Sequence, residues 1–459
     1  MKAITVSDIL IATKGTLIRG NKTQRITDVC IDSKSIPSEA TLFIPLKGER
    51  VDAHKFIDNA IENGAIGCIV SDLLKVPENV QIVIEVADTK KALQDIGAYY
   101  RKTRDIKLVG VTGSVGKTTT RELTAAALMA IGRENVYQTL GNRNSQTGVP
   151  LTLCDIADEK LGVIELGISE EGEMDILTEM AELDAAIITV IGVAHIQQLK
   201  SQENICREKM AITKGLKADG CILINGDDQF QRDYRSKLNH KSYLYGTAED
   251  CDFRATDIKQ QADGMSFNFH AEGKVYEAYI PIMGMHNVVN ATAALGAACV
   301  LGVDVNEAIK SIADFKGVKM RQQILEKNGF TVIDDSYNAN PDSMKAGLKV
   351  LADYELKTCG RKIALLADMK ELGDDEVHYH EEIGGFAAGM PIDMLLTVGT
   401  LAESIGKICR TKNKSIITIH FDDNAQASEY LNTKLKAGDI LYVKGSRSMA
   451  LDEVVKALK

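Results

Sequence analysis

The chain has 459 residues, 45% of them hydrophobic, which is enough to fill two or three domain cores rather than one. Its 54 basic and 64 acidic side chains leave a net charge of −10, which argues against a broad binding surface for nucleic acid or for an anionic membrane. Nine cysteines without a Cys-x-x-Cys pair, no signal-peptide pattern and no apolar run of roughly 18 residues predict a cytoplasmic protein without membrane insertion.

Residues 1–86 combine short apolar runs with one amphipathic segment at residues 54–63, a pattern that predicts a small α/β domain. A helix-like stretch follows at residues 88–105, where apolar residues recur at helical spacing. It leads into a buried strand at residues 107–111. We expect a second domain, residues 87–316, to begin with this helix and strand.

From residue 107 onward, strand-like runs alternate with helical segments, which predicts a mostly parallel sheet with helices on both faces. Residues 252–283 have the pattern of short antiparallel strands and are expected at the edge of that sheet. The alternation restarts after Gly317 and predicts a third domain over residues 317–459, in which a single helix joins the strand-like runs at residues 394–398 and 440–445. The predicted fold class is α/β, with a central parallel-sheet domain of the P-loop ATPase type between a small N-terminal α/β domain and a C-terminal Rossmann-like domain.

A glycine-rich stretch joins the buried strand at residues 107–111 to a predicted helix. Backbone N–H groups at such a junction can face a polyphosphate. Lys117 can reach the terminal phosphates, and the Thr118 hydroxyl can ligate magnesium. The expected cofactor-binding residues in this loop are Gly113, Ser114, Val115, Gly116, Lys117, Thr118 and Thr119.

The loop departs from the usual phosphate-binding motif at Val111, where a glycine is expected. The sequence TGSVGKTTT at residues 112–120 resembles the loop of the Mur ligase superfamily, which lacks that glycine. Further segments match this family in chain order: GNRNSQTGVPLTL (141–153), VIELG (163–167), AHIQ (194–197), REKMAI (207–212), GMHNVVNATAAL (284–295), MRQQ (320–323), DDSYNANPDSM (334–344), DMKELG (368–373) and VKGSRSM (443–449).

The resemblance implies an ATP-dependent ligase that activates a carboxylate as an acyl phosphate and joins it to an amine. DDSYNANPDSM and DMKELG look most like the members that add D-alanyl-D-alanine to UDP-N-acetylmuramoyl-tripeptide in peptidoglycan synthesis. Residues 32–60 are similar to the UDP-binding domain of those members. Residues 1–86 are therefore expected to bind the UDP-sugar, 87–316 to bind ATP, and 317–459 to bind the dipeptide and complete the ATP site.

The resemblance also implies where metal ions and reacting groups lie. Thr118 and Glu165 are expected on one magnesium ion, with His195 and Lys209 near a second. Family members carry a carbamylated lysine at the position of Lys209, so the expected cofactors are ATP, Mg²⁺ and that carbamate. Without the resemblance, Lys209 would be interpreted as a solvated lysine and His195 as a structural histidine. The expected catalytic residues are Lys117, Lys209, His195 and Arg321.

Arg321 is expected at the γ-phosphate and Asp335 at the ribose of ATP. Asn287 and Asn290 are expected at adenine, although ordinary helix capping also explains asparagines there. The expected substrate contacts are Ser33, Lys34, Asn142, Asn144, Asn338, Asn340 and Ser343, and capping is again the alternative for the last three. His378 and His380 are expected to be surface or packing residues.

Five residues depart from the family pattern, and they leave the substrate less defined than the reaction: Lys34, Ser145, Val193, Met210 and Ala367. One alternative is therefore a Mur-type ligase acting on a different peptide or amine. The UDP-type N-terminal segment argues against folate as its substrate. Another alternative is a non-catalytic nucleotide-binding switch, although the metal and phosphate residues are all present. We expect a monomer whose partners are UDP-muramoyl-tripeptide and D-alanyl-D-alanine.

Overall fold

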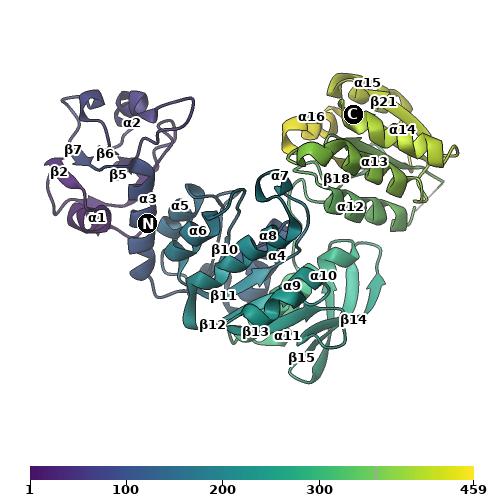
Figure 1. Ribbon diagram of the computed structural model, residues 1–459, viewed down its shortest axis with the longest axis horizontal. Coiled ribbons are helices and arrows are strands. Elements are labelled where there is room, and N and C mark those ends of the chain that lie inside the picture. The colour runs from purple at the N-terminus through teal and green to yellow at the C-terminus, as the bar shows by residue number, and fades with distance from the viewer. Residues whose placement is uncertain (357–358) are drawn as a thin grey trace.

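Residues 1–356 and 359–459 are described by a computed structural model, in which three α/β units follow one another along the chain (Figure 1). The predicted fold class is confirmed, because a nine-stranded sheet lies between a small N-terminal unit and a six-stranded C-terminal unit. None of the helices in the described ranges is long and apolar enough to cross a membrane.

The N-terminal unit contains a five-stranded sheet and a two-stranded sheet. The larger sheet has the order β2 (Thr16–Arg19), β7 (Ile82–Glu85), β6 (Gly67–Val70), β5 (Thr41–Phe43), β4 (Asp28–Cys30), and the smaller one pairs β1 (Ile4–Thr5) with β3 (Arg25–Ile26). Its helices are α1 (Val6–Thr13), η1 (Ala53–Phe56), α2 (Ile57–Glu62), η2 (Leu73–Lys75) and α3 (Thr89–Lys102).

Helix α3 joins this unit to the central one. Asp88 caps the helix by accepting hydrogen bonds from the N–H groups of Lys90 and Lys91. Tyr100, buried in the N-terminal core, donates its hydroxyl to the carbonyl of Ile156 at 2.6 Å. The side of α3 that packs on the first sheet is therefore also hydrogen-bonded to the second unit.

The central sheet has the order β16 (Lys274–Ile280), β15 (Met265–Ala271), β14 (Phe253–Gln260), β13 (Lys241–Gly246), β12 (Leu216–Asn225), β11 (Leu183–Ile188), β8 (Lys107–Thr112), β10 (Leu161–Glu165), β9 (Val136–Gln138). Its strands are parallel from β9 to β14, and β14, β15 and β16 pair antiparallel, which confirms the expected antiparallel edge. The helices are α4 (Lys117–Leu128), η3 (Met129–Ile131), η4 (Arg133–Asn135), α5 (Gly148–Asp155), α6 (Glu173–Ala181), α7 (Ile196–Leu199), α8 (Gln202–Met210), η5 (Ala211–Gly215), α9 (Gln229–Tyr234), η6 (Arg235–Lys237), α10 (Met285–Val300) and α11 (Val305–Ala313). Buried apolar residues form one cluster on each face, which is why the central strands β8, β10 and β11 are buried along nearly their whole length.

The C-terminal sheet has the order β17 (Gln323–Lys327), β18 (Phe330–Asp334), β22 (Ile440–Lys444), β19 (Lys362–Ala367), β20 (Met394–Val398), β21 (Ile417–Phe421), and only β17 is antiparallel to its neighbour. The helices are α12 (Pro341–Asp353), η7 (Gly373–Asp375), α13 (Glu376–Ala387), α14 (Ala402–Lys412), α15 (Asn424–Lys434), η8 (Arg447–Met449) and α16 (Leu451–Ala457). The sequence predicted a single helix between β20 and β22, which is wrong, because α14, β21 and α15 lie there. Edge strand β21 escaped prediction since most of it is only partly buried and Ile417 is exposed.

The carboxyl ends of strands from both large sheets approach one region. β8 leads into the loop that carries Val115 and Gly116, whereas β18 leads to Asp335 and β22 ends at Lys444. These four residues line the same cavity. Open α/β sheets bind ligands at the carboxyl ends of their strands, so this is where a functional site is expected.

Candidate active site

The phosphate loop connects β8 to α4 and is held by the strand beside it. Gly113 has φ 148°, and a Cβ there would lie 1.8 Å from Thr189 Oγ1. That hydroxyl donates to the carbonyl of Val115 at 2.5 Å, and the N–H of Ser114 donates to the carbonyl of Val190 at 2.7 Å. Only glycine fits at 113, because Thr189 leaves no room for a Cβ there and its hydroxyl also holds the loop at Val115.

Lys117 folds back over this loop. Its Nζ donates to the carbonyl of Gly113 at 2.8 Å, and burial lowers the pKa of Lys117, with nearby Glu165 opposing this and Arg321 adding to it. Loop carbonyls are the ammonium group's hydrogen-bond partners in the structure. A terminal phosphate could replace them, because it offers a charged acceptor to a poorly solvated cation.

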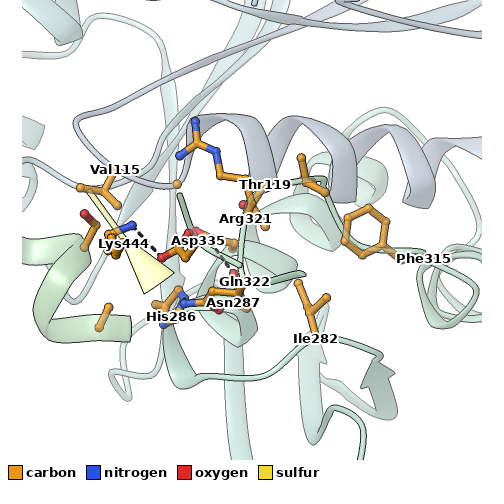
Figure 2. Close-up of a pocket in the computed structure, with 15 residues that line it drawn as sticks. Val115, Thr119, Ile282, His286, Asn287, Phe315, Arg321, Gln322, Asp335 and Lys444 are labelled. Carbon is orange, nitrogen blue, oxygen red and sulfur yellow. Dashed lines mark hydrogen bonds and ion pairs between the residues drawn. The ribbon is translucent and has the colours of Figure 1, made fainter. Parts of the chain in front are cut away.

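A cavity beside the loop is lined by residues of the central and C-terminal units (Figure 2). Asn287 donates from Nδ2 to the carbonyl of Met283 at 2.7 Å and to Gln322 Oε1 at 3.1 Å. Asn290 donates to Asn287 Oδ1 at 3.3 Å. Both asparagines are buried in the wall, and Figure 2 shows Phe315 and Ile282 on the apolar side of the cavity. An aromatic base with polar edges matches this lining.

Asp335 lies at the other side of the cavity and is held by two buried partners. Its Oδ2 accepts from Lys444 Nζ at 2.6 Å and from the Tyr442 hydroxyl at 2.9 Å. Burial lowers the pKa of Lys444, and Asp335 opposes that shift. Figure 2 shows the contact with Lys444, and together with Tyr442 it fixes the orientation of the carboxylate before any ligand arrives.

Arg321 reaches from the start of the C-terminal unit to the phosphate loop. Its guanidinium lies over the ring of Tyr337, 4.2 Å from the centroid, and donates from Nη2 to Thr118 Oγ1 at 3.4 Å. A neighbouring pocket around this contact is lined by loop residues and, from the C-terminal unit, by Arg321 itself, Asn338, Ala339, Asn340 and Ser343. Asn340 and Ser343 also form the capping box of α12. Both interpretations of these two residues, capping and pocket wall, thus coexist.

Glu165 ends β10, where it is 3% exposed. Its carboxylate accepts from Asn144 Nδ2 at 2.7 Å and from Arg121 Nη1 at 3.3 Å. The same Arg121 nitrogen donates to the carbonyl of Gly141 at 2.8 Å. Asn144 therefore points to Glu165. It does not line the cavity between the N-terminal and central units, which the nearby Asn142 lines.

Lys209 near the end of α8 is 1% exposed, although its helix is rich in charge. Burial holds the pKa of Lys209 well below its usual value, the positive charge of Lys117 lowers it further, and Glu208 opposes. A buried amine beside another cation is favoured in its neutral form. The local sequence alone suggested that Lys209 is a solvated lysine, and the structure shows that it is buried.

His195 precedes α7 with φ 62°, a conformation rare for residues other than glycine. Its Nδ1 lies 2.9 Å from Glu371 Oε2, an ion-pair distance without the alignment of a hydrogen bond.

Of the other two histidines considered, His378 is exposed. His380 is buried, accepts at Nε2 from the N–H of Met369 at 2.9 Å, and is a packing residue as expected.

A larger cavity lies between the N-terminal and central units. Its wall includes Asp32, Ser35, Asn142 and Arg143. Neither Ser33 nor Lys34 is among its lining residues. Ser33 is 7% exposed and Lys34 is exposed beside the cavity.

Comparison with known proteins gives matches along most of the chain. Residues 25–101 match the "Mur ligase family, catalytic domain", 111–298 the "Mur ligase middle domain" and 320–447 the "Mur ligase, glutamate ligase domain". A UDP-N-acetylmuramoyl-tripeptide–D-alanyl-D-alanine ligase of Bacillus subtilis (strain 168) is 35% identical over 457 residues, covering 99% of this chain and 98% of the relative. The chain belongs to the Mur ligase family.

Solved structures agree with this membership over the whole length. MurF from Acinetobacter baumannii superposes with a TM-score of 0.90 at 30% identity, covering 100% of this chain and 99% of that one. MurF ligase from Thermotoga maritima in complex with ADP has a TM-score of 0.81 at 28% identity, covering 94% and 96%. The three-unit architecture is therefore that of a Mur ligase.

Several side chains at the site of this Mur ligase were not singled out from the sequence: Arg121, His286, Gln322, Tyr337, Glu371 and Lys444. Five of them lie inside the motifs quoted for the family resemblance, so membership of a motif was the available signal. Arg121 follows the phosphate loop without any such signal. The departures at Val193, Met210 and Ala367 are buried, and Ser145 lines the N-terminal cavity.

His286 gives this Mur ligase a testable pH dependence of stability. Burial lowers the pKa of His286 to about 4, below its ordinary value of 6.5. Below pH ~6.5 the unfolded chain takes up a proton that the folded chain refuses, so the free energy of unfolding should fall by about 3 kcal/mol towards pH 4. In denaturant titrations between these pH values, His286→Gln should flatten that slope relative to wild type. An equal slope in the variant would contradict the assignment, with exposed His378→Gln as the control.

Proposed function

We propose that this chain is an ATP-dependent ligase that adds D-alanyl-D-alanine to UDP-N-acetylmuramoyl-tripeptide in peptidoglycan synthesis. The observation that carries the proposal is the end-to-end match, at 35% identity over 99% of the chain, to a ligase of that name. The phosphate loop, the lined cavity and Arg321 support ATP as the energy source. A different amide ligase of the family would share these features, so substrates must be tested directly.

The three units divide the work. Residues 1–86 bind the UDP-sugar, residues 87–316 bind ATP, and residues 317–459 bind the dipeptide and complete the ATP site. Asn142 lines the cavity between the first two units, which supports it as a muropeptide contact. Ser33, Lys34 and Asn144 do not line this cavity but are neighbours in sequence of residues that do, and we propose that they contribute to binding the same substrate. Asn338, Asn340 and Ser343 face the phosphate loop, where the dipeptide amine must arrive.

Residues around the cavity beside the phosphate loop bind the nucleotide. The N–H groups of residues 113–119 and Lys117 hold the phosphates, while Asn287 and Asn290 contact adenine. Asp335, already fixed by Lys444, accepts from the ribose hydroxyls. Arg321 lies 3.4 Å from Thr118, so its guanidinium can neutralise charge on the γ-phosphoryl group during transfer.

The residues present fit Mg²⁺ bound together with phosphates. Within residues 1–356 and 359–459, no cluster of three His, Cys, Asp or Glu side chains forms a dedicated metal cage. Mg²⁺ typically binds one or two carboxylates and completes its shell with water and phosphate oxygens. Thr118 and Glu165 would hold one ion, with His195 and Lys209 near a second. When bound, the metal supplies positive charge that lets two anionic substrates approach.

Lys209 carries a carbamate in this proposal. Its burial and lowered pKa support a neutral amine, which is the form that reacts with carbon dioxide. The product replaces a neutral amine by a carbamate anion, whose oxygen atoms can ligate a metal and whose negative charge is attracted to the neighbouring Lys117.

The reaction transfers the γ-phosphoryl group of ATP to the tripeptide carboxylate and releases ADP. The dipeptide amine then attacks the acyl carbon, phosphate leaves, and the amine loses its proton. Lys117 and Arg321 stabilise charge in the first step. In the second step, the cavity lined by Asn142 and the pocket lined by Asn338 orient the two peptide substrates. We propose that the enzyme acts as a monomer in the cytoplasm.

Phosphate release should require both peptide substrates. The acyl phosphate is consumed by the dipeptide amine, so omission of UDP-muramoyl-tripeptide or of D-alanyl-D-alanine should lower the steady rate at least about tenfold. The measurement is phosphate release by the full chain, with substitution of other dipeptides and of folate as a specificity panel. Equal ATP hydrolysis without either substrate would favour a switch, and turnover only with another amine would favour a different ligase.

A further inference from the structure

The segment DMKELG, residues 368–373, reaches from the C-terminal unit to the central one. Glu371 Oε2 lies 2.9 Å from Nδ1 of His195, which precedes α7. In Figure 1, α7 lies at the part of the central unit next to the C-terminal domain. The segment therefore touches the histidine proposed to lie near a metal ion.

The DMKELG segment is anchored within its own unit. The N–H of Met369 donates to the buried His380 at 2.9 Å, and the N–H of Lys370 donates to Ser446 Oγ at 2.9 Å. Asp368 Oδ1 accepts from the N–H of Ala402 at 2.8 Å. These three hydrogen bonds fix the backbone just before Glu371, so the Glu371 side chain extends from a fixed position toward His195.

Further contacts along the His195 loop accompany this one. The Asp342 carboxylate of α12 packs against Gly192, where an added Cβ would lie 2.1 Å from Oδ2. A Cβ on Gly373 would lie 3.5 Å from the Cα of Gln197. The C-terminal unit thus contacts the loop on both sides of His195, so Glu371 is part of a continuous interface.

His195 and Glu371 both have left-handed backbones, with φ 62° and φ 66°. Residues with a Cβ adopt this conformation at an energetic cost and keep it only where surrounding structure fixes them. His195 and Glu371 face each other from different units, so we infer that their backbone conformations fix the positions from which the two side chains meet.

We propose that Glu371 is a positioning residue that orients the imidazole of His195 from the C-terminal domain. This rests on the proposed function. A carboxylate 2.9 Å from Nδ1 stabilises a proton on that nitrogen through its charge, which leaves the lone pair on Nε2, and carboxylate partners of this kind commonly orient histidines near metals. Because Glu371 belongs to the other domain, His195 is held in this way only when the C-terminal domain is docked. Domain docking thereby completes the site that binds magnesium and nucleotide.

Glu371 and His195 are both partly exposed, with side-chain exposures of 56% and 27%. Exposed ion pairs contribute little to stability, so removing Glu371 should leave the melting temperature near that of wild type. A structural role and a positioning role are therefore separable by experiment.

The test is calorimetric binding of a non-hydrolysable ATP analogue to the full chain, in excess Mg²⁺ and in EDTA. Glu371→Ala should lose about tenfold of the affinity gained with Mg²⁺ and keep the affinity measured in EDTA. Glu371→Gln, which retains an acceptor oxygen, should lie closer to wild type. In a His195→Ala background, Glu371→Ala should have no further effect, because it acts through that ring.

Glu381→Ala, an exposed carboxylate of α13, is the matched control and should bind as wild type. The proposal is overturned if Glu371→Ala keeps the full gain with Mg²⁺, if it weakens binding equally in EDTA, or if its effect persists without His195. Failure of the proposed function is distinguishable, because the wild-type chain would then bind the analogue without ligating the peptides.

Discussion

Replacing Lys209 by alanine should lower the rate of ligation by at least about 100-fold, the usual effect of losing one preorganised electrostatic group in an active site. Lys209 is 1% exposed, and burial together with Lys117 holds its pKa well below the ordinary value. The neutral amine can become a carbamate that offers oxygen ligands. Alanine removes both the amine and the carbamate, whereas the phosphate loop is left in place.

Small carboxylic acids should rescue this variant. Acetate or formate can enter the space vacated by the side chain and present an oxygen where the carbamate stood. Ligation by Lys209→Ala should therefore rise with added acid, and ligation by wild type should not. Lys209→Arg should stay inactive, because a permanent cation cannot be carbamylated.

Lys214→Ala is the matched control, because that lysine lies shortly after α8 but is 63% exposed and pairs with Asp175. It should change stability by no more than about 0.5 kcal/mol and leave turnover intact. An active Lys209→Arg enzyme would refute the carbamate, since it would show that positive charge suffices there. Absence of rescue by any acid, with the variant shown to be folded, would count against an oxygen ligand at this position.

The contrast between Lys209 and Lys214 shows what the sequence could not reveal. Both stand among charged residues, and local periodicity gives them the same interpretation. Their exposures differ because α8 buries one side, with Ile205, Cys206 and Met210 in the core cluster beside the central sheet, and only the tertiary fold decides which side that is. The family resemblance singled out Lys209, but its burial and lowered pKa came from the structure.

Local sequence predicted the strand–loop–helix structure around Gly113 and Gly116, because a buried strand, two glycines and a helix start lie within a few residues of one another. The βαβ alternation likewise predicted both large sheets. The partners of the site residues are different, since Arg121 on Glu165 and Glu371 on His195 are joined only by long-range packing. Edge strand β21 was missed for a related reason, because its half-buried residues carry no buried-strand pattern.

Replacing Lys444 by methionine should lower the free energy of unfolding of the C-terminal domain by about 3–5 kcal/mol, because breaking one partner of a buried ion pair leaves an uncompensated charge. Lys444 Nζ lies 2.6 Å from Asp335 Oδ2, with side-chain exposures of 2% and 8%. In the variant, Tyr442 alone would remain to donate to that oxygen. Calorimetry of the full chain should show the loss as an earlier transition, together with weaker ATP binding.

The double variant Lys444→Met, Asp335→Asn should recover most of the lost stability, since replacing both members of a buried pair by neutral groups is often tolerated. ATP binding should stay weak, because the proposed ribose acceptor has lost its charge. Recovery of affinity along with stability would show that Asp335 acts only through folding. A wild-type transition in the single variant would show that the pair is not buried as described.

Lys456 provides the comparison that isolates burial. Its Nζ also lies 2.6 Å from an aspartate, Asp452, but its side chain is 68% exposed. Water and salt screen that pair, so Lys456→Met should cost no more than about 1 kcal/mol. Two lysines with the same ion-pair distance should therefore differ several-fold in their contribution to stability, and the cause is the solvent around them. Equal costs would mean that the cavity wall around Asp335 is as well hydrated as the surface of α16, which would remove the reason for expecting a preoriented ribose acceptor there.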